Sequence, residues 1–186
     1  MAKCGRLCLC LGLFLSAAVW GGGGRSMPAP KPSDPQLTPL TQKLFDLLVQ
    51  LKGRGVLFGQ QDVFRSGHSR SDIAFESDVK QVSGKWPAMM GLDFREPFAW
   101  PESFWEPYKN MIQHYHALGG VVTLSWHMDN PVTLEGPLDG TPAVRAILPG
   151  GEKHGLYLTW LDALARFLQE LRDIQGRPIP ILLRPF

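Results

Sequence analysis

The chain has 186 residues, of which 44% are hydrophobic and 19% are charged, a composition typical of a globular protein with room for one domain. Its formal net charge of +2 gives no electrostatic reason to expect binding to nucleic acid or to an anionic surface. All three cysteines (Cys4, Cys8 and Cys10) precede residue 11, so the rest of the chain has no disulfide, thiol nucleophile or cysteine metal site.

Residues 1–26 have the pattern of a secretory signal peptide. Lys3 and Arg6 precede an apolar run over 7–19, which is short for a membrane span. A membrane anchor that is not cleaved is the alternative. Residues 27–39 are rich in proline, and we interpret them as a linker. We therefore expect a protein that is secreted, periplasmic or on the cell surface, with no stable membrane association after signal cleavage.

Helices and strands are predicted to alternate along residues 40–186. The first helix has Thr38 as its N-cap and ends at Gly53, and a later helix has Thr159 and Asp162 as a capping box. The strands are nearly continuous in apolar residues, which is typical of a parallel sheet covered by helices. Doubly wound and barrel folds both fit this pattern. In chain order, strands are expected over 55–59, 88–93, 121–125 and 179–184, and further helices over 77–82, 104–118 and 159–171.

Polar residues follow each predicted strand, at the ends that form the active-site face of parallel α/β folds. One such residue could be structural, but four strands with this feature favour a polar site. Polar residues are densest in SWHMDNPVT, over 125–133. This stretch either projects its side chains into a cleft or forms a turn before Pro131, and the residues alone favour neither possibility. The polar residues after the four strands are Gln60, Gln61 and Asp62; Asp93, Arg95 and Glu96; Ser125, His127, Asp129 and Asn130; and Arg184.

These residues make some kinds of site less plausible than others. A metal site is disfavoured because the histidines of HYH, over 114–116, diverge on a helix and no HExxH spacing occurs. The sequence also has no G-x-S-x-G nucleophile elbow and no glycine-rich phosphate-binding loop, which disfavours serine catalysis and phosphate binding. Retaining glycoside hydrolysis needs two carboxylates about 5–5.5 Å apart, and no convincing pair is present among the strand-end acids. Stacking on sugar rings is suggested by four tryptophans near strand ends, namely Trp86, Trp100, Trp105 and Trp126.

Five ordered motifs together resemble glycoside hydrolase family 26, and most closely its β-mannanases. The motifs are LFGQQD, SDVKQVSGKWPAMMGLDF, VVTLSWHMDNPVT, ILPGGEKH and PIPILLRPF, which lie between residues 57 and 186. The resemblance implies a (β/α)8 TIM barrel, of which residues 40–186 would form about the first four β/α units. It also implies hydrolysis of β-1,4-mannosidic bonds in mannan by a retaining mechanism, without a cofactor or a metal.

The resemblance assigns substrate binding to five residues of this chain. His127 matches a histidine that contacts the sugar next to the cleavage point, and Trp126 and Asn130 flank it in the same motif. Arg184 matches an arginine expected to orient nearby carboxylates. Asp93 matches an acidic position after the second strand.

The same resemblance places both catalytic residues outside this sequence. The family motif after the fourth strand is Arg-Pro-aromatic-His-Glu, and Arg184, Pro185 and Phe186 match its beginning. The acid/base Glu and the nucleophile Glu are therefore expected beyond Phe186, and the chain alone is expected to be inactive. Two alternatives are the same fold acting on another β-glycan, and a non-catalytic carbohydrate-binding or vestigial protein.

Overall fold

The computed structural model describes residues 30–32, 35–64, 75–99 and 101–184. The predicted signal peptide, Trp100 and the Pro185–Phe186 end of the last motif lie outside these residues. Within the described part of the chain, no helix combines the length and the apolar character that a membrane crossing requires.

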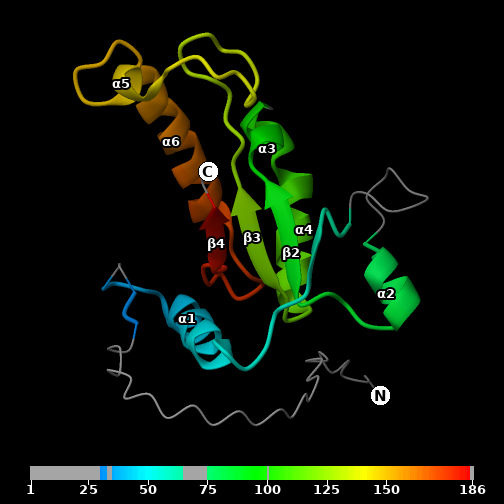
Figure 1. Ribbon diagram of the computed structural model, residues 1–186. Helices are drawn as coiled ribbons and strands as arrows, with labels where there is room; N and C mark the ends of the chain where they lie inside the picture. Colours follow the sequence, from blue (N-terminus) through cyan, green and yellow to red (C-terminus); the bar gives the residue numbers. More distant parts are fainter. Residues whose placement is uncertain (1–29, 33–34, 65–74, 100, 185–186) are drawn as a thin grey trace, which may run out of the picture.

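The centre of the structure is a four-stranded parallel sheet (Figure 1). Its strands are β1 (Gly59–Gln61), β2 (Met89–Asp93), β3 (Val121–Ser125) and β4 (Ile181–Arg184), and they lie side by side in chain order. A doubly wound sheet reverses its strand order at a switch point, whereas a barrel adds each strand beside the preceding one. The observed order therefore selects the barrel arrangement that the sequence pattern left undecided.

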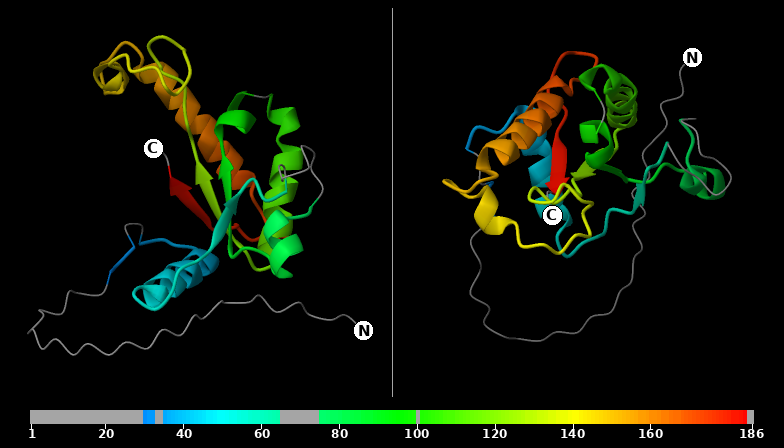
Figure 2. Two further views of the ribbon diagram at one scale, coloured as in Figure 1. Left: turned by 45° about the vertical axis from the view of Figure 1, so that its right-hand side comes forward. Right: turned by 90° about the horizontal axis from the view of Figure 1, so that it is seen from above.

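Two long helices cover one face of the sheet. Helix α4 (Glu106–Ala117) and helix α6 (His154–Glu170) lie on the same side of the strands when the molecule is seen from above (Figure 2). Both helices turn apolar residues at a spacing of three or four toward the strands, which is why they are stable there. The buried side chains are Tyr108, Met111, Ile112 and Tyr115 of α4, Trp160, Leu164 and Phe167 of α6, and Met90, Leu92, Val122 and Leu124 of the sheet.

The remaining helices lie around this core. Helices α1 (Pro39–Leu51) and α2 (Asp78–Ser83) were predicted. The cap expected at Thr38 is confirmed, because the Thr41 amide donates to Thr38 Oγ1 at 3.2 Å. Helix α2 has a cap that was not predicted, in which the Lys80 amide donates to Ser77 Oγ at 3.3 Å. Helix α3 (Arg95–Ala99), the 3-10 helix η1 (Glu102–Phe104) and helix α5 (Val144–Ile147) were not predicted.

Two predicted boundaries are wrong. The first strand does not cover 55–59, because pairing with β2 starts at Gly59 opposite Met89, and Val56 and Phe58 are 92% and 63% exposed. The apolar residues over 55–58 therefore precede the strand and do not belong to its hydrogen-bonded part. The last helix starts at His154 and not after Thr159, whose hydroxyl donates to the Gly155 carbonyl at 3.1 Å inside the helix.

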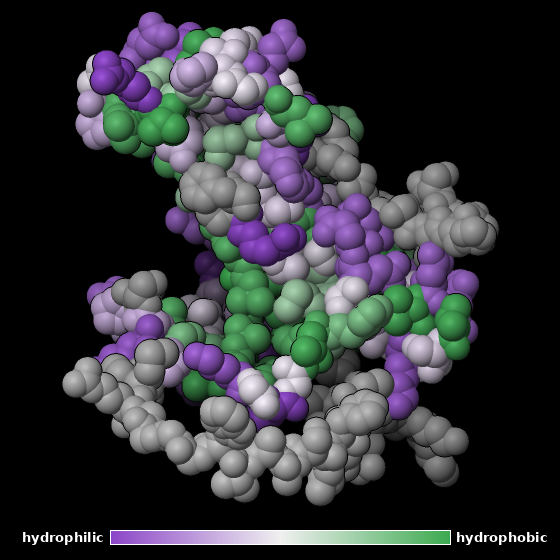
Figure 3. Space-filling model, viewed as in Figure 1, coloured by the Kyte–Doolittle hydropathy of each residue, from purple (hydrophilic) through white to green (hydrophobic). Residues whose placement is uncertain are grey.

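The face of the sheet opposite α4 and α6 leaves apolar atoms at the surface. Figure 3 shows them in the middle of the view, over the strands. Leu183 of β4 is 41% exposed. The two outer strands of the four, β1 and β4, have a strand neighbour on one side only among the described residues.

Candidate functional site

A polar cluster lies where β2 and β3 end. Register places Asp93, the last residue of β2, beside Ser125, the last residue of β3. His127 follows two residues later, and its Nδ1 contacts Asp93 Oδ2. The His127 amide donates to Asp93 Oδ1 at 3.2 Å, and Ser125 Oγ donates to Asp93 Oδ2 at 3.3 Å. The chain therefore brings together two of its predicted site residues, Asp93 and His127.

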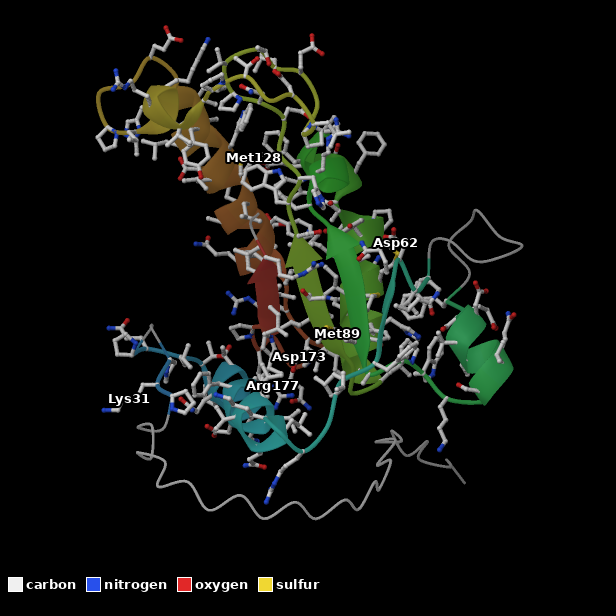
Figure 4. The ribbon with its side chains drawn as sticks, in the orientation of Figure 1. Lys31, Asp62, Met89, Met128, Asp173 and Arg177 are labelled. Carbon is white, nitrogen blue, oxygen red and sulfur yellow. The ribbon has the colours of Figure 1, made fainter. Side chains whose placement is uncertain are left out.

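Figure 4 locates this end of the sheet. Met128, which follows His127 in the chain, lies beyond the arrowhead of β3, and Asp62 lies beyond β1. Met89 marks the opposite end of β2, on the side of Asp173 and Arg177. The cluster thus occupies the carboxyl ends of parallel strands, the face on which barrel enzymes carry their active sites.

Helix α4 fixes the backbone of Asp93. The buried Tyr108 hydroxyl accepts a hydrogen bond from the Asp93 amide at 3.0 Å and donates one to the Asp93 carbonyl at 2.6 Å. Both backbone groups of the strand end are thereby paired. The sequence placed Tyr108 only within the predicted helix over 104–118, and no sequence signal separated the function of its hydroxyl from the packing of its ring.

The environment of Asp93 favours its ionised form. Partial burial by itself would raise the pKa of Asp93, but the hydrogen bonds from the Arg95 amide, the His127 side chain and the His127 amide outweigh burial and hold the pKa below its ordinary value of 3.8. The Asp93 side chain is 24% exposed, while the His127 side chain is 63% exposed. An ionised, nearly enclosed carboxylate therefore supports an imidazole that faces solvent.

Arg95 and Asp129 form an ion pair beside this cluster. Arg95 Nε and Nη2 lie 3.2 Å and 2.9 Å from the same Asp129 Oδ1. The side chains are 48% and 35% exposed, so the pair contributes about 0–1 kcal/mol to stability. Its role is to hold the loop after β3 against α3. Glu96 was the third acidic candidate at these strand ends, and its side chain lies outside the described residues.

Asn130 is buried and organises the loop that follows β3. Its Nδ2 donates to the Thr141 carbonyl at 2.8 Å, and its Oδ1 accepts from the Val132 amide at 2.9 Å. The turn interpretation of SWHMDNPVT is therefore correct for Asn130, while the side chain of His127 faces solvent. Sugar contacts of Asn130 and His127 stay predictions. The same loop borders an open depression of about 710 Å³, lined by Arg95, Thr133, Glu135, Gly136, Pro137, Leu138, Asp139 and Thr141.

Trp126 points away from solvent and is only 2% exposed. Its ring lies 5.5 Å from Phe94 and 5.4 Å from Phe98, centroid to centroid. Its Nε1 is buried and has no hydrogen-bond partner among the described residues. This placement is that of a core residue directly beneath the site, and a direct sugar contact for Trp126 stays a prediction.

Arg184 ends β4 opposite Ser125, so register places it in one row with Asp93. Its Nε donates to Thr123 Oγ1 at 2.8 Å, and the Thr123 hydroxyl donates in turn to the Leu182 carbonyl at 3.0 Å. Within the described residues its guanidinium makes no ion pair with a carboxylate. The expected role of Arg184 in orienting carboxylates stays a prediction.

The other candidates serve the fold. Trp105 is buried among Phe94 and Phe167, and Lys80 Nζ lies 4.2 Å from the centre of the Trp86 ring. Gln60 Oε1 accepts from Ser77 Oγ at 2.8 Å and so ties the end of β1 to the start of α2. In the parts of the chain that the structure describes, no group of three histidine, cysteine or acidic side chains is arranged to hold a metal ion.

The sequence of this chain is similar to known glycoside hydrolases. The family model described as glycosyl hydrolase family 26 matches residues 33–186. A mannan endo-1,4-beta-mannosidase from Bifidobacterium adolescentis is 35% identical over 163 residues, which are 82% of this chain and 16% of that protein.

Solved structures give the same result. A β-mannanase of this family from Bacteroides ovatus matches with a TM-score of 0.74 and 33% identity, over 80% of this chain and 45% of that one. A double mutant of a Cellulomonas fimi endo-beta-1,4-mannanase matches with a TM-score of 0.74 and 32% identity, over 80% of this chain and 36% of that one. The chain thus spans less than half the length of these relatives, and its four-stranded parallel sheet has the fold of part of a (β/α)8 barrel.

Proposed function

Because the chain belongs to glycosyl hydrolase family 26, we propose that it functions in the hydrolysis of β-1,4-mannosidic bonds in mannan. The observation that carries the proposal is the Asp93–His127 pair at the carboxyl ends of the strands, in a chain whose relatives are described as mannanases. A sugar is rich in hydroxyl groups, and a solvent-facing imidazole held by a carboxylate can bind one of them.

The proposed reaction is a retaining double displacement. One carboxylate attacks the anomeric carbon and forms a covalent glycosyl-enzyme, while a second protonates the leaving oxygen and later takes a proton from the attacking water. We assign both steps to Glu residues outside residues 1–186, because the family resemblance places them after the motif that contains Arg184. The residues described here would bind and orient the sugar, with His127 in direct contact.

Export is part of the proposal and is supported by the sequence of residues 1–26 alone. A basic start and an apolar run of signal-peptide length are suited to a protein that meets a polysaccharide outside the cell. Amino-terminal sequencing of the protein recovered from the culture medium or the periplasm tests it. A mature chain that still begins at Met1 would refute signal cleavage.

The activity is tested by measuring reducing sugar released by the full-length gene product. The expected result is release from β-mannan that exceeds release from xylan and from mixed-linkage β-glucan, with the β configuration in the first product seen by proton NMR. Activity on xylan or glucan but not mannan would refute the substrate. Retention on an immobilised mannan without any release would indicate a binding protein instead. Residues 27–186 expressed alone are expected to release no sugar.

A further inference from the structure

The Asp93 carboxylate receives hydrogen bonds from three parts of the chain. Its Oδ1 accepts from the Arg95 amide at 3.0 Å and from the His127 amide at 3.2 Å. Its Oδ2 accepts from Ser125 Oγ at 3.3 Å and contacts His127 Nδ1. The carboxylate therefore links the end of β2, the start of α3 and the segment after β3, and it bonds both the backbone and the ring of His127.

We propose that Asp93 is a positioning residue that fixes the tautomer of His127, so that Nε2 offers a lone pair to a hydroxyl group of the sugar. This inference rests on the proposed function for the identity of the ligand. The tautomer itself follows from the contacts, whatever the ligand is.

The direction of the hydrogen bonds to Asp93 determines the tautomer of His127. Two amide N–H groups donate to the carboxylate, and the one hydrogen of Ser125 Oγ is shared between Asp93 Oδ2 at 3.3 Å and the Leu92 carbonyl at 3.2 Å. The carboxylate therefore acts as an acceptor toward all these neighbours. The ring nitrogen that contacts Oδ2 must then carry its hydrogen. A neutral imidazole carries one hydrogen only, so a hydrogen on Nδ1 leaves Nε2 as an acceptor.

The other charged side chains near His127 have partners of their own, so Asp93 is the group that determines the tautomer. The neighbouring acid Asp129 is paired with Arg95, and Arg184 donates to the Thr123 hydroxyl. The His127 side chain is 63% exposed, and among the described residues the contact with Asp93 is the one seen for its ring. Its free nitrogen is then available to a polar ligand that donates a hydrogen bond, as a sugar hydroxyl does.

The first test is spectroscopic and needs no activity. In the full-length protein labelled with 15N-histidine, the His127 signals are assigned by their loss in His127→Gln. In the neutral form of the imidazole, we expect Nδ1 at the protonated position and Nε2 at the unprotonated position. Asp93→Asn can turn its amide group toward the ring, and the hydrogen is expected to move to Nε2. Asp129→Asn is the matched control and is expected to leave both signals in place. A protonated Nε2 in the unsubstituted protein would overturn the proposal.

The second test is a double-mutant cycle on kcat/KM for mannan. Asp93→Asn and His127→Ala are each expected to lower kcat/KM about tenfold or more, and the double variant is expected to lose no more than His127→Ala alone. Additive losses would overturn the proposal, because Asp93 would then act independently of His127. A protein that shows the expected tautomer but hydrolyses no mannan would refute the proposed function and leave the positioning role of Asp93 intact.

Discussion

Replacing Tyr108 by Phe tests how the candidate site is attached to the fold. The change removes one hydroxyl from a ring that is 1% exposed and leaves the shape of the ring unchanged. That hydroxyl pairs with the Asp93 amide at 3.0 Å and with the Asp93 carbonyl at 2.6 Å. Both backbone groups lose this partner at once, which costs about 1–3 kcal/mol of unfolding free energy. For a chain of this size, each kcal/mol corresponds to roughly 2–4 °C in Tm.

Urea unfolding of the full-length protein, followed by circular dichroism, measures this change. Tyr157→Phe is the matched control, because its hydroxyl has no hydrogen bond within the part of the chain that the structure describes, and its removal should cost less than about 0.5 kcal/mol. Hydrogen exchange at the Asp93 amide should also become faster in Tyr108→Phe. Equal unfolding free energies for the two variants would show that Tyr108 does not hold the strand end.

Three further predictions concern the site and its support. His127→Ala should lower kcat/KM on mannan by a factor that corresponds to about 1–3 kcal/mol, and an unchanged kcat/KM would show that His127 is structural. The pKa of Asp93 is lower in the folded chain than its ordinary 3.8, so its contribution to stability is present above that pH and is lost as pH falls through the folded pKa. In Asp93→Asn the free energy of unfolding should therefore depend less on pH in this range, and an unchanged pH dependence would contradict this. Gly120→Ala would bring a methyl group within 2.2 Å of the Tyr115 ring and should lower the free energy of unfolding by about 1–3 kcal/mol. Gly155→Ala is the control, because the added methyl group meets open space there, and equal melting temperatures for the two variants would contradict the packing of Tyr115 against Gly120.

Much of the fold could be predicted because it depends on local patterns. The spacing of apolar residues located α4, and Thr38 marked the start of α1 through a hydroxyl group that pairs with a backbone amide close by in sequence. Such patterns cannot decide which residues pair across a sheet. This is why β1 was placed four residues too early, and why the pattern of helices and strands, without the family resemblance, left barrel and doubly wound folds equally possible.

The sequence by itself determined which residue types meet at the site, and the tertiary structure decided what each one does. A histidine and an acid after two buried strands were enough to predict that Asp93 and His127 share one edge of a sheet, because parallel strands end on the same side. Only the folded chain showed that these neighbours differ. The amide of Asn130 is hydrogen-bonded within its own loop and Trp126 is buried, whereas His127 faces solvent. The physical reason is that side-chain direction and burial depend on neighbours far away in sequence: the Tyr108 hydroxyl reaches Asp93 from a helix 15 residues later, and the Asp93 carboxylate reaches His127 across 34 residues.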